Sequence, residues 1–492
     1  MTTKKQDEYD DRIEKLEAIR HLGINPYPDS FEKTHSAAAI VTSKTGTQVQ
    51  TAGRILTIRE MGKICFCHIQ DSSGQIQVVL RVDEIGQEEF KKFLKIFDPG
   101  DFVGIAGEIF KTKRGELSVL VKQFTMLGKT LRPLPEKWHG LKDQELLYRQ
   151  RYLDLITNRE TFERFMFRSG FIKALREFYW QEGFMEVETP VLANTASGAL
   201  ATPFITHHNA LDIDVYLRIA IETHQKELIV GGMEKIFEIG RCFRNEGMDP
   251  SHLQEFTSCE HYAAYWNFED NMRFTEKMFE FLLKKLFGSL KITIKDRAGK
   301  AVEINFKTPW PRVSFAQLLK KDSGIDITQH ETDESLRAAI SKKKITIEGI
   351  EKLGRGNLID ALYKATSRAK LTGPIFLVSH PVELSPLARR NNDDQSIVDR
   401  FQLVVNGWEI ANAYSELVDP LEQRKRFEIQ AKAKAAGDTD AHGKDDEFVR
   451  SLEHGAPPIS GWGMGIDRIV TLLTNQDNLR DVVLFPLLRP EK

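Results

Sequence analysis

The chain has 492 residues and a net charge of −2, and this length favours two to four domains with apolar cores of their own. No apolar run reaches membrane-spanning length and the first residues lack the apolar segment of a signal peptide, so we expect a soluble, cytoplasmic protein without membrane contact. The four cysteines are too few and too poorly spaced for a disulfide framework or a zinc site.

The N-terminal region predicts a helical appendage over residues 1–45. Within residues 7–23, apolar side chains recur at helical spacing from Ile13 to Leu22, and Gly23 ends the pattern. We expect a charged amphipathic helix that packs by its apolar stripe.

Residues 49–127 change to short alternating strands separated by turn signals such as the one at 71–74. Five such strands, with one helix over 84–96, predict a small Greek-key barrel of the oligonucleotide-binding (OB) type. We assign residues 46–130 to this domain. OB barrels bind single-stranded nucleotides by stacking bases on aromatic side chains.

Residues 131–159 contain two prolines and Gly140, and we interpret them as the connection between domains. The second domain is expected to span residues 160–492, with an insertion at about 270–385. That insertion has helical runs and a hairpin pattern but no chemical motif, and its charges over 342–352 are interpreted as surface.

A charged strand pair follows, running out over 237–246 and back over 256–262. Period-2 alternation gives each strand a polar face, with Arg244 and Glu246 on the first strand and Phe256, Glu260 and Tyr262 on the second. An arginine can neutralise a phosphate, a phenylalanine can stack on a purine, and carboxylates can hold amines. The alternative is an edge hairpin with solvated charges.

Asn406-Gly407 lies between two apolar runs and is a strong hairpin signal, so Val405 should pair with Trp408 and Val404 with Glu409. Alternation beyond the turn puts Asn412, Tyr414 and Glu416 on one face. Glu409 and Asn412 are three residues apart, so a bulge near 410–411 is required if both serve one site. A buried carboxylate at 416 needs a cation, and a helix-cap or salt-bridge role is the alternative for Glu416.

Two further segments complete a set. Gly183-Phe-Met-Glu-Val-Glu-Thr-Pro190 follows an amphipathic run, and Gly461-Trp-Gly-Met-Gly-Ile-Asp-Arg468 is a Gly-rich strand that opens a helix. The first of these segments resembles motif 1 of the class II aminoacyl-tRNA synthetases, the strand pair at 237–262 resembles motif 2, and the second segment resembles motif 3. The resemblance covers almost the whole chain and is strongest to the lysyl-tRNA synthetases of bacterial type.

This resemblance implies an α+β fold, with an N-terminal OB-fold β-barrel and an antiparallel β-sheet catalytic domain flanked by helices. It also implies a homodimer formed through motif 1. The expected reaction joins L-lysine to ATP as lysyl-adenylate and then transfers lysine to the 3' end of tRNA(Lys) for translation.

The resemblance also implies the nucleotide contacts. Arg244 would bridge the amino-acid carboxylate and the α-phosphate, Arg468 would hold the γ-phosphate, and these two would be the catalytic residues. The ATP-binding set is Arg244, Glu246, His252, Phe256, Glu409 and Arg468. Mg²⁺ would bind with ATP at Glu409 and at Gln402, where the family usually has a second carboxylate, so the metal site is one negative charge short.

The implied lysine pocket holds the ε-ammonium between Glu222 and Glu416. The full set is Gly198, Glu222, Arg244, Glu260, Tyr262, Asn412, Tyr414 and Glu416, with Gly198 and Glu260 at the α-amino group. An aspartate- or asparagine-activating relative would need a cation or amide donors instead, so two acids argue for a cationic substrate.

In the barrel, Phe66, Gln77 and Glu116 match the residues that read the central anticodon uridine, and a core role is the alternative for Phe66. Two rival functions stay open. One is an aspartyl- or asparaginyl-type ligase, and the other is a non-catalytic tRNA- or nucleotide-binding paralogue, which Gln402 favours.

Overall fold

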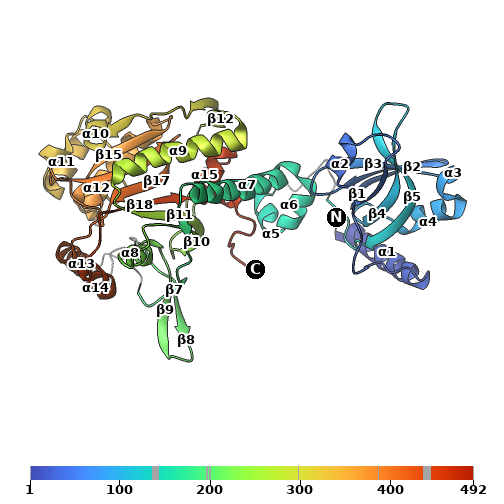
Figure 1. The fold of residues 1–492 in the computed structure, drawn as a ribbon, viewed down its shortest axis with the longest axis horizontal. Helices are drawn as coiled ribbons and strands as arrows, with labels where there is room; N and C mark the ends of the chain where they lie inside the picture. The colour runs from blue at the N-terminus through green and yellow to red at the C-terminus, as the bar shows by residue number, and fades with distance from the viewer. Residues whose placement is uncertain are drawn as a thin grey trace. The chain divides into compact units, whose positions relative to one another are not determined.

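The computed structural model describes residues 2–135, 143–195, 198, 201–296, 299–385, 387–435 and 445–490. The chain divides into two compact units, Met1–Gln144 and Glu145–Lys492 (Figure 1). Part of the expected connection, 136–142, lies outside the described residues. Among the helices that the structure describes, none has the length and apolar character needed to cross a bilayer.

The first unit contains a closed five-stranded barrel with strand order β1-β2-β3-β5-β4, in which β4 pairs back onto β1. This confirms the OB prediction. The expected single helix is divided at Gly86, whose φ of +83° belongs to the left-handed region. The elements are β1 (Gln48–Met61), β2 (Ile64–Gln70), β3 (Gln75–Arg81), α3 (Val82–Ile85), α4 (Gln87–Ile96), β4 (Phe102–Lys111) and β5 (Leu117–Gly128).

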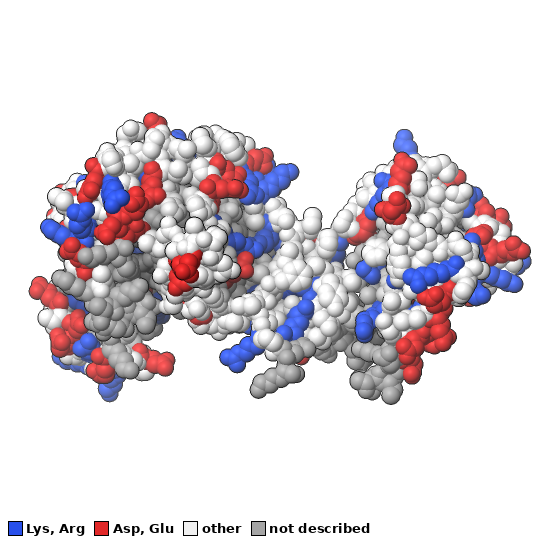
Figure 2. Space-filling model, turned by 90° about the horizontal axis from the view of Figure 1, so that it is seen from below, with Lys and Arg blue, Asp and Glu red and all other residues white. Residues whose placement is uncertain are grey.

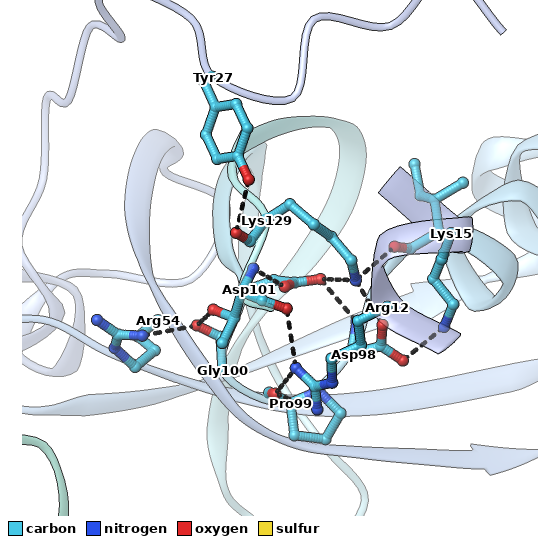
Figure 3. A network of polar contacts seen from close by, with 11 residues as sticks. Arg12, Lys15, Tyr27, Arg54, Asp98, Pro99, Gly100, Asp101 and Lys129 are labelled. Atoms are coloured by element: carbon cyan, nitrogen blue, oxygen red, sulfur yellow. Dashed lines mark hydrogen bonds and ion pairs between the residues drawn. The ribbon is translucent and has the colours of Figure 1, made fainter. Parts of the chain in front are cut away.

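The N-terminal helix α1 (Thr2–His21) is held against the barrel by apolar and ionic contacts. Ile19 is fully buried in the barrel's core cluster. Lys15 forms an ion pair of 2.6 Å with Asp98, which lies in the loop before β4 (Figure 3). Beside it, the buried Lys129 lies 2.8 Å from the equally buried Asp101. The predicted helix is therefore present and starts earlier than its apolar pattern indicated. A short helix, α2 (Ala37–Thr42), precedes β1.

The second unit is built on an eight-stranded sheet of order β14-β15-β16-β17-β18-β11-β10-β6. All neighbouring pairs are antiparallel except the two outermost, β14 with β15 and β10 with β6. This sheet confirms the predicted α+β class. Its strands are β6 (Met185–Glu186), β10 (Lys235–Phe243), β11 (Glu255–Ala264), β14 (Arg312–Ser314), β15 (Ile375–Pro381), β16 (Ile397–Val405), β17 (Trp408–Ser415) and β18 (Ile459–Gly465).

Two long helices, α7 (Arg159–Gln181) and α9 (Phe268–Phe287), pack together, and α9 also packs on β16, β17 and β18. Their apolar side chains share the largest core with alternate residues of the sheet, such as Cys259, Ala413 and Trp462. Because strand side chains alternate between faces, the intervening residues of these strands point to the opposite face. That opposite face is available for a site.

Some of the remaining elements lie around this sheet, whereas the separate β7-β9-β8 sheet projects away from it (Figure 1). The segment between β14 and β15 has its own apolar cluster, which includes Leu336, Leu358 and Leu362. The elements not yet given are α5 (Gln144–Arg149), α6 (Arg151–Thr157), β7 (Leu192–Ala193), β8 (Ile205–His208), β9 (Ile213–Leu217), α8 (Glu222–Val230), β12 (Lys291–Lys295), β13 (Ala301–Asn305), α10 (Phe315–Ser323), α11 (Asp333–Lys342), α12 (Arg355–Thr366), α13 (Pro420–Ala435), α14 (Asp446–Glu453) and α15 (Ile466–Leu473). The described residues also form the short 3₁₀ turns η1 (Ile327–Gln329), η2 (Ile350–Lys352), η3 (Arg368–Lys370), η4 (Val382–Leu384) and η5 (Leu479–Val482).

Candidate functional site

A cavity of about 340 Å³ lies in the second unit, on the sheet face away from α9. Seven of the eight residues expected to bind lysine line it, and these are Gly198, Glu222, Arg244, Glu260, Tyr262, Asn412 and Tyr414. The eighth, Glu416, directly follows β17 and is 2% exposed. The volume is within the usual range for small-molecule sites.

The shape of the cavity follows from strand order. Strand β18 lies between β17 and β11, and its glycines face polar residues on both sides. Gly461 is paired with Tyr262 and Tyr414, and Gly463 is paired with Glu260 and Asn412. A central strand without side chains on this face therefore forms the floor, and the polar rows on either side form the walls.

The predicted hairpin after β16 is confirmed. Val405 pairs with Trp408 and Val404 with Glu409, and the register then shifts so that Leu403 pairs with Ala411. Ile410 is the extra residue, which confirms the bulge expected near 410–411. The bulge places Glu409 and Asn412 on one face although they are three residues apart.

One end of the cavity is acidic. Glu222 begins α8, and the Tyr414 hydroxyl donates to its carboxylate, 2.9 Å from each oxygen. Burial raises the pKa of Glu416 while the neighbouring Lys226 acts in the opposite direction. Burial, with a contribution from Glu222, raises the pKa of Glu260 to about 7. This end therefore favours a cationic ligand.

Arg244 lines the other end of the cavity, and Arg468 lies outside the cavity lining. Strand β10 ends at Phe243, one residue before Arg244, whose guanidinium lies 5.1 Å from the centre of the Phe256 ring. Arg468, in the first turn of α15, has Nη1 3.5 Å from the carbonyl oxygen of Glu409. These groups can neutralise phosphates and stack on a flat base.

Of the six residues in the expected nucleotide set, Arg244 lines the cavity and the other five do not. Glu246 and His252 are in the exposed loop between β10 and β11, where His252 Nδ1 is 2.7 Å from Oδ2 of Asp249. Neither lines the cavity. We expected Arg244 and Glu246 to share one face of a strand, but the strand ends before both residues and Glu246 lies in the loop.

Three residues near the site escaped the sequence interpretation. Arg400 lines the cavity and donates from Nε to Oδ1 of Asn412 at 2.7 Å, which fixes the orientation of that amide. Its position two residues before Gln402 on a strand was the available signal. Lys226 pairs with both acids of the cavity and sits one helical turn after Glu222. His380 contacts Gln402, and no sequence pattern pointed to it.

The expected metal ligands have different surroundings. Nε2 of His380 is 3.2 Å from Oε1 of Gln402, and burial keeps the pKa of this histidine well below its usual value. The neutral ring therefore donates to Gln402. Among the described residues, no group of three or more His, Cys, Asp or Glu side chains could hold a metal ion. Glu409 is a single carboxylate, which suits an ion that also binds phosphates.

In the barrel, two of the expected anticodon residues contact each other, the buried Gln77 and the exposed Glu116, and the third lies on the adjacent strand. Nε2 of Gln77 donates to Oε2 of Glu116 at 3.0 Å, and Phe66 lies on the adjacent strand. Phe66 is half-buried and outside the barrel's core cluster, whereas its neighbours Cys65 and Cys67 are fully buried. His68, which the sequence interpretation did not include, pairs in register with Gln77.

Basic side chains lie close to this surface. Lys111 at the end of β4 and Lys113 and Arg114 in the turn that follows are exposed, and Glu116 lies in the same turn. Elsewhere the charges of both signs are mixed on the face that Figure 2 shows. Local basic surface of this kind suits phosphate contacts even when the net charge is near zero.

Comparison with known proteins gives matches for both units. Residues 143–489 match the family model of the class II tRNA synthetases for D, K and N, and residues 49–127 match an OB-fold nucleic acid binding domain. The lysine–tRNA ligase of Thermosipho africanus is 46% identical over 488 residues, which are 97% of this chain and 95% of that protein. The lysine–tRNA ligases of Moorella thermoacetica and Enterococcus faecalis are also 46% identical, over 98% and 97% of this chain and 97% and 96% of their own lengths.

Proposed function

The chain belongs to the lysine–tRNA ligases of the class II aminoacyl-tRNA synthetases, and from this membership we propose how its residues share the reaction. The enzyme activates lysine with ATP and transfers it to tRNA. In activation, the lysine carboxylate attacks the α-phosphorus of ATP and pyrophosphate leaves. In transfer, the terminal ribose hydroxyl of the tRNA attacks the lysyl carbonyl and AMP leaves.

The acid end of the cavity is the observation that supports our assignment of the lysine side chain. Glu222 and Glu416 are both buried there and already share an ammonium group, that of Lys226. A buried carboxylate pair is costly unless a cation compensates it. We assign the ε-ammonium of the substrate to this end and its α-amino group to Glu260. Asn412, oriented by Arg400, donates to the carboxylate.

The opposite end receives ATP in our proposal. Arg244 bridges the lysine carboxylate and the α-phosphate, and Phe256 beneath it stacks on adenine. Arg468 neutralises the γ-phosphate. Positive groups held in place where negative charge develops stabilise such a transition state. Glu246 and His252 would join the nucleotide only after their exposed loop moves toward it.

Mg²⁺ fits the site as an ion brought by ATP. Glu409 would hold it together with the phosphates, since Mg²⁺ commonly takes one or two carboxylates plus substrate oxygens. The ion would neutralise phosphate charge when bound. Gln402 could contribute an oxygen or a water contact only by giving up its contact with His380.

We assign the central anticodon base to the surface of Phe66, Gln77 and Glu116. A base stacked on Phe66 would meet the amide of Gln77, which Ser118 fixes by donating to Oε1 at 2.9 Å. We place the enzyme in the cytoplasm with its tRNA. The four cysteines, all within the described residues, are free thiols, which agrees with a reducing compartment.

A second copy of this chain is the partner that we propose for the motif 1 region. Met166 and Trp180 on α7 and Met185 on β6 are exposed by 57%, 58% and 50%. Large apolar side chains that are exposed in this way are typical of an interface. Sedimentation velocity should give a dimer, and Trp180→Glu should shift it toward monomer. A monomeric wild-type protein at micromolar concentration would contradict this proposal.

ATP–pyrophosphate exchange against a panel of amino acids tests the assignment of the pocket. We expect lysine to support exchange, aspartate and asparagine to give none, and uncharged lysine analogues to fail. Exchange with aspartate or asparagine would favour the related ligases. No exchange with any amino acid, together with retained tRNA binding, would favour a non-catalytic paralogue.

A further inference from the structure

Lys226 is a buried cation at the acid end of the lysine pocket. It lies on α8, one turn after Glu222, and its Nζ is 2.5 Å from Oε1 of that residue. It forms a second ion pair with Oε2 of Glu416. Its side chain is 2% exposed, and three aromatic rings surround the ammonium with centres 5.6 to 6.0 Å away, those of Tyr262, Tyr414 and Phe448.

The ammonium of Lys226 approaches the two acids from outside the cavity. Glu222 lines the cavity, whereas Lys226 does not. Oε1 of Glu416 has no hydrogen-bond partner among the described residues, and it lies against Gly461, which does line the cavity. Each acid therefore gives one oxygen to Lys226, and Glu416 keeps the other toward the cavity floor.

The charges of this cluster depend on one another. Burial lowers the pKa of Lys226, but the attraction of Glu222 and Glu416 outweighs it, so the pKa is raised overall. The residue therefore stays an ammonium. Without it, two buried carboxylates would repel each other, and one would take up a proton rather than remain charged.

We propose that Lys226 is a positioning residue that determines the specificity of the lysine pocket, an inference that rests on the proposed assignment of the substrate ammonium to Glu222 and Glu416. It holds both acids in place and neutralises one of their two negative charges. When both acids are ionised, the pocket then offers a single net negative charge, which matches one side-chain ammonium. A neutral or acidic side chain would leave that charge unpaired.

Several titratable groups face this cluster and share its titration. Strand β11 contributes Glu260 and Tyr262, strand β17 contributes Tyr414, and α8 contributes Glu222 and Lys226. Helix α14, which packs against α8, contributes the ring of Phe448, while Asp445 at its start faces His224. Because Lys226 is the only cation among the described groups that touch both acids, removing it should raise the pKa of Glu416 further.

The test compares Lys226→Met with Lys226→Arg. Methionine keeps an unbranched apolar stem and removes the charge, whereas arginine keeps the charge. Lysine KM and kcat are measured by ATP–pyrophosphate exchange from about pH 6.5 to about pH 8.5, a window that brackets the raised carboxyl pKa values. Lysine binding is also measured by calorimetry. Lys284→Met is the matched control, since Lys284 forms an exposed ion pair of 2.6 Å with Glu280 at the same helical spacing.

We expect Lys226→Met to raise the lysine KM about tenfold or more with little change in kcat or in the ATP KM. The pH at which lysine KM changes should shift upward, because Glu416 ionises later without its partner. Lys226→Arg should recover part of the affinity, and Lys284→Met should behave as wild type. A lower lysine KM would instead show that Lys226 competes with the substrate, and an unchanged KM would show that Lys226 has no role in lysine binding. Either result would overturn the proposal.

A purely structural role gives a different result. KM and kcat would then worsen together, with a lower melting temperature and no shift in the pH profile, and this would overturn the proposal. The double variant with Glu416→Gln gives a second check, and Lys226→Arg alone carries the test if Lys226→Met does not fold. Lys226→Met should cost less in that background than in wild type, and equal costs would contradict action through Glu416. Failure of the pocket assignment itself would appear separately, as loss of lysine preference in the wild-type panel.

Discussion

Glu416 and Gly461 touch at the acid end of the cavity, where Oε1 of the carboxylate occupies the space that a side chain at 461 would need. A Cβ built at Gly461 would overlap both this oxygen and the ring of Tyr262. At Gly463, two residues on, a Cβ would be 3.5 Å from Cγ of Glu260, which is ordinary contact. The two glycines of one strand therefore differ in what they exclude.

We expect Gly461→Ala to lower the free energy of unfolding by about 1 to 3 kcal/mol, the usual cost of overpacking, and to raise the lysine KM. Gly463→Ala should change the unfolding free energy much less. Urea denaturation of both variants measures the difference. Equal destabilisation by the two substitutions would show that the contact with Glu416 does not restrict residue 461.

Glu416→Gln should raise the lysine requirement by orders of magnitude, because removing one partner of a buried ion pair costs about 3 to 5 kcal/mol. The ATP KM should stay near that of wild type, since Arg244 and Arg468 lie at the other end of the site. Exchange kinetics with each substrate varied in turn provide the measurement. An unchanged lysine dependence would contradict the assignment of the acid end.

Glu260 should make lysine binding depend on pH near neutrality. Burial and Glu222 raise its pKa to about 7, so the carboxylate is protonated as the pH falls below that value. We expect the lysine KM to rise as the pH falls from about 8 to about 6, because a protonated acid no longer attracts the α-ammonium. Glu260→Gln should remove this component and raise the KM at high pH. A dependence that persists in the variant would have to come from another group.

The same shift has a stability consequence of known sign. A glutamate in the unfolded chain has a pKa of about 4.3. Between that pH and about pH 7, the folded state therefore binds more protons at Glu260 than the unfolded state does. This residue therefore makes stability fall as the pH rises through that window. Urea midpoints of wild type and Glu260→Gln should converge at the low end and separate at the high end, with the variant more stable.

Local patterns predicted much of this molecule. Alternation correctly placed Phe256, Glu260 and Tyr262 on one face, because the register of this strand is unbroken and a regular strand has a fixed period of two. The Asn406-Gly407 signal gave the hairpin register, and the mismatch between Glu409 and Asn412 gave the bulge. Each of these features depends on residues that are close together in the chain, so it can be predicted from the sequence alone.

Contacts between distant segments were beyond such reasoning. Lys226 meets Glu416 across 190 positions, and only the packing of α8 beside the end of β17 brings them together. His380 reaches Gln402 because a backbone irregularity at Ser379, with φ of +57°, resets the register of β15. Glu246 was placed by a strand pattern that stops before it, since hydrogen bonding at the loop ended the strand at Phe243.

Phe66→Ala should weaken use of tRNA while leaving adenylate formation intact. Loss of one stacked base costs about 1 to 3 kcal/mol, which corresponds to roughly tenfold to a hundredfold in the tRNA KM. Phe102→Ala is a matched control, because Phe102 is an exposed ring on a different strand, β4. It pairs with Arg54 of β1, whose guanidinium lies 4.2 Å from the centre of the ring. If exchange activity fell along with aminoacylation, Phe66 would be acting through the fold and not through the anticodon.

The magnesium requirement should report on Gln402. Its Oε1 accepts from the neutral ring of His380, and its strand partner is Asn412, so it faces the cavity side of the sheet. Gln402→Glu adds the carboxylate that the site lacks, and it should lower the magnesium concentration needed for half-maximal ATP–pyrophosphate exchange. Glu409→Gln removes the remaining carboxylate and should abolish most activity.

His380 supplies the control for this prediction. A new carboxylate at 402 would favour protonation of the adjacent imidazole, and the resulting positive charge would oppose metal binding. We therefore expect Gln402→Glu combined with His380→Gln to lower the magnesium requirement further than Gln402→Glu alone. If neither variant moved the magnesium titration, or if Glu409→Gln behaved as wild type, the metal would have to bind through ATP and water without these side chains.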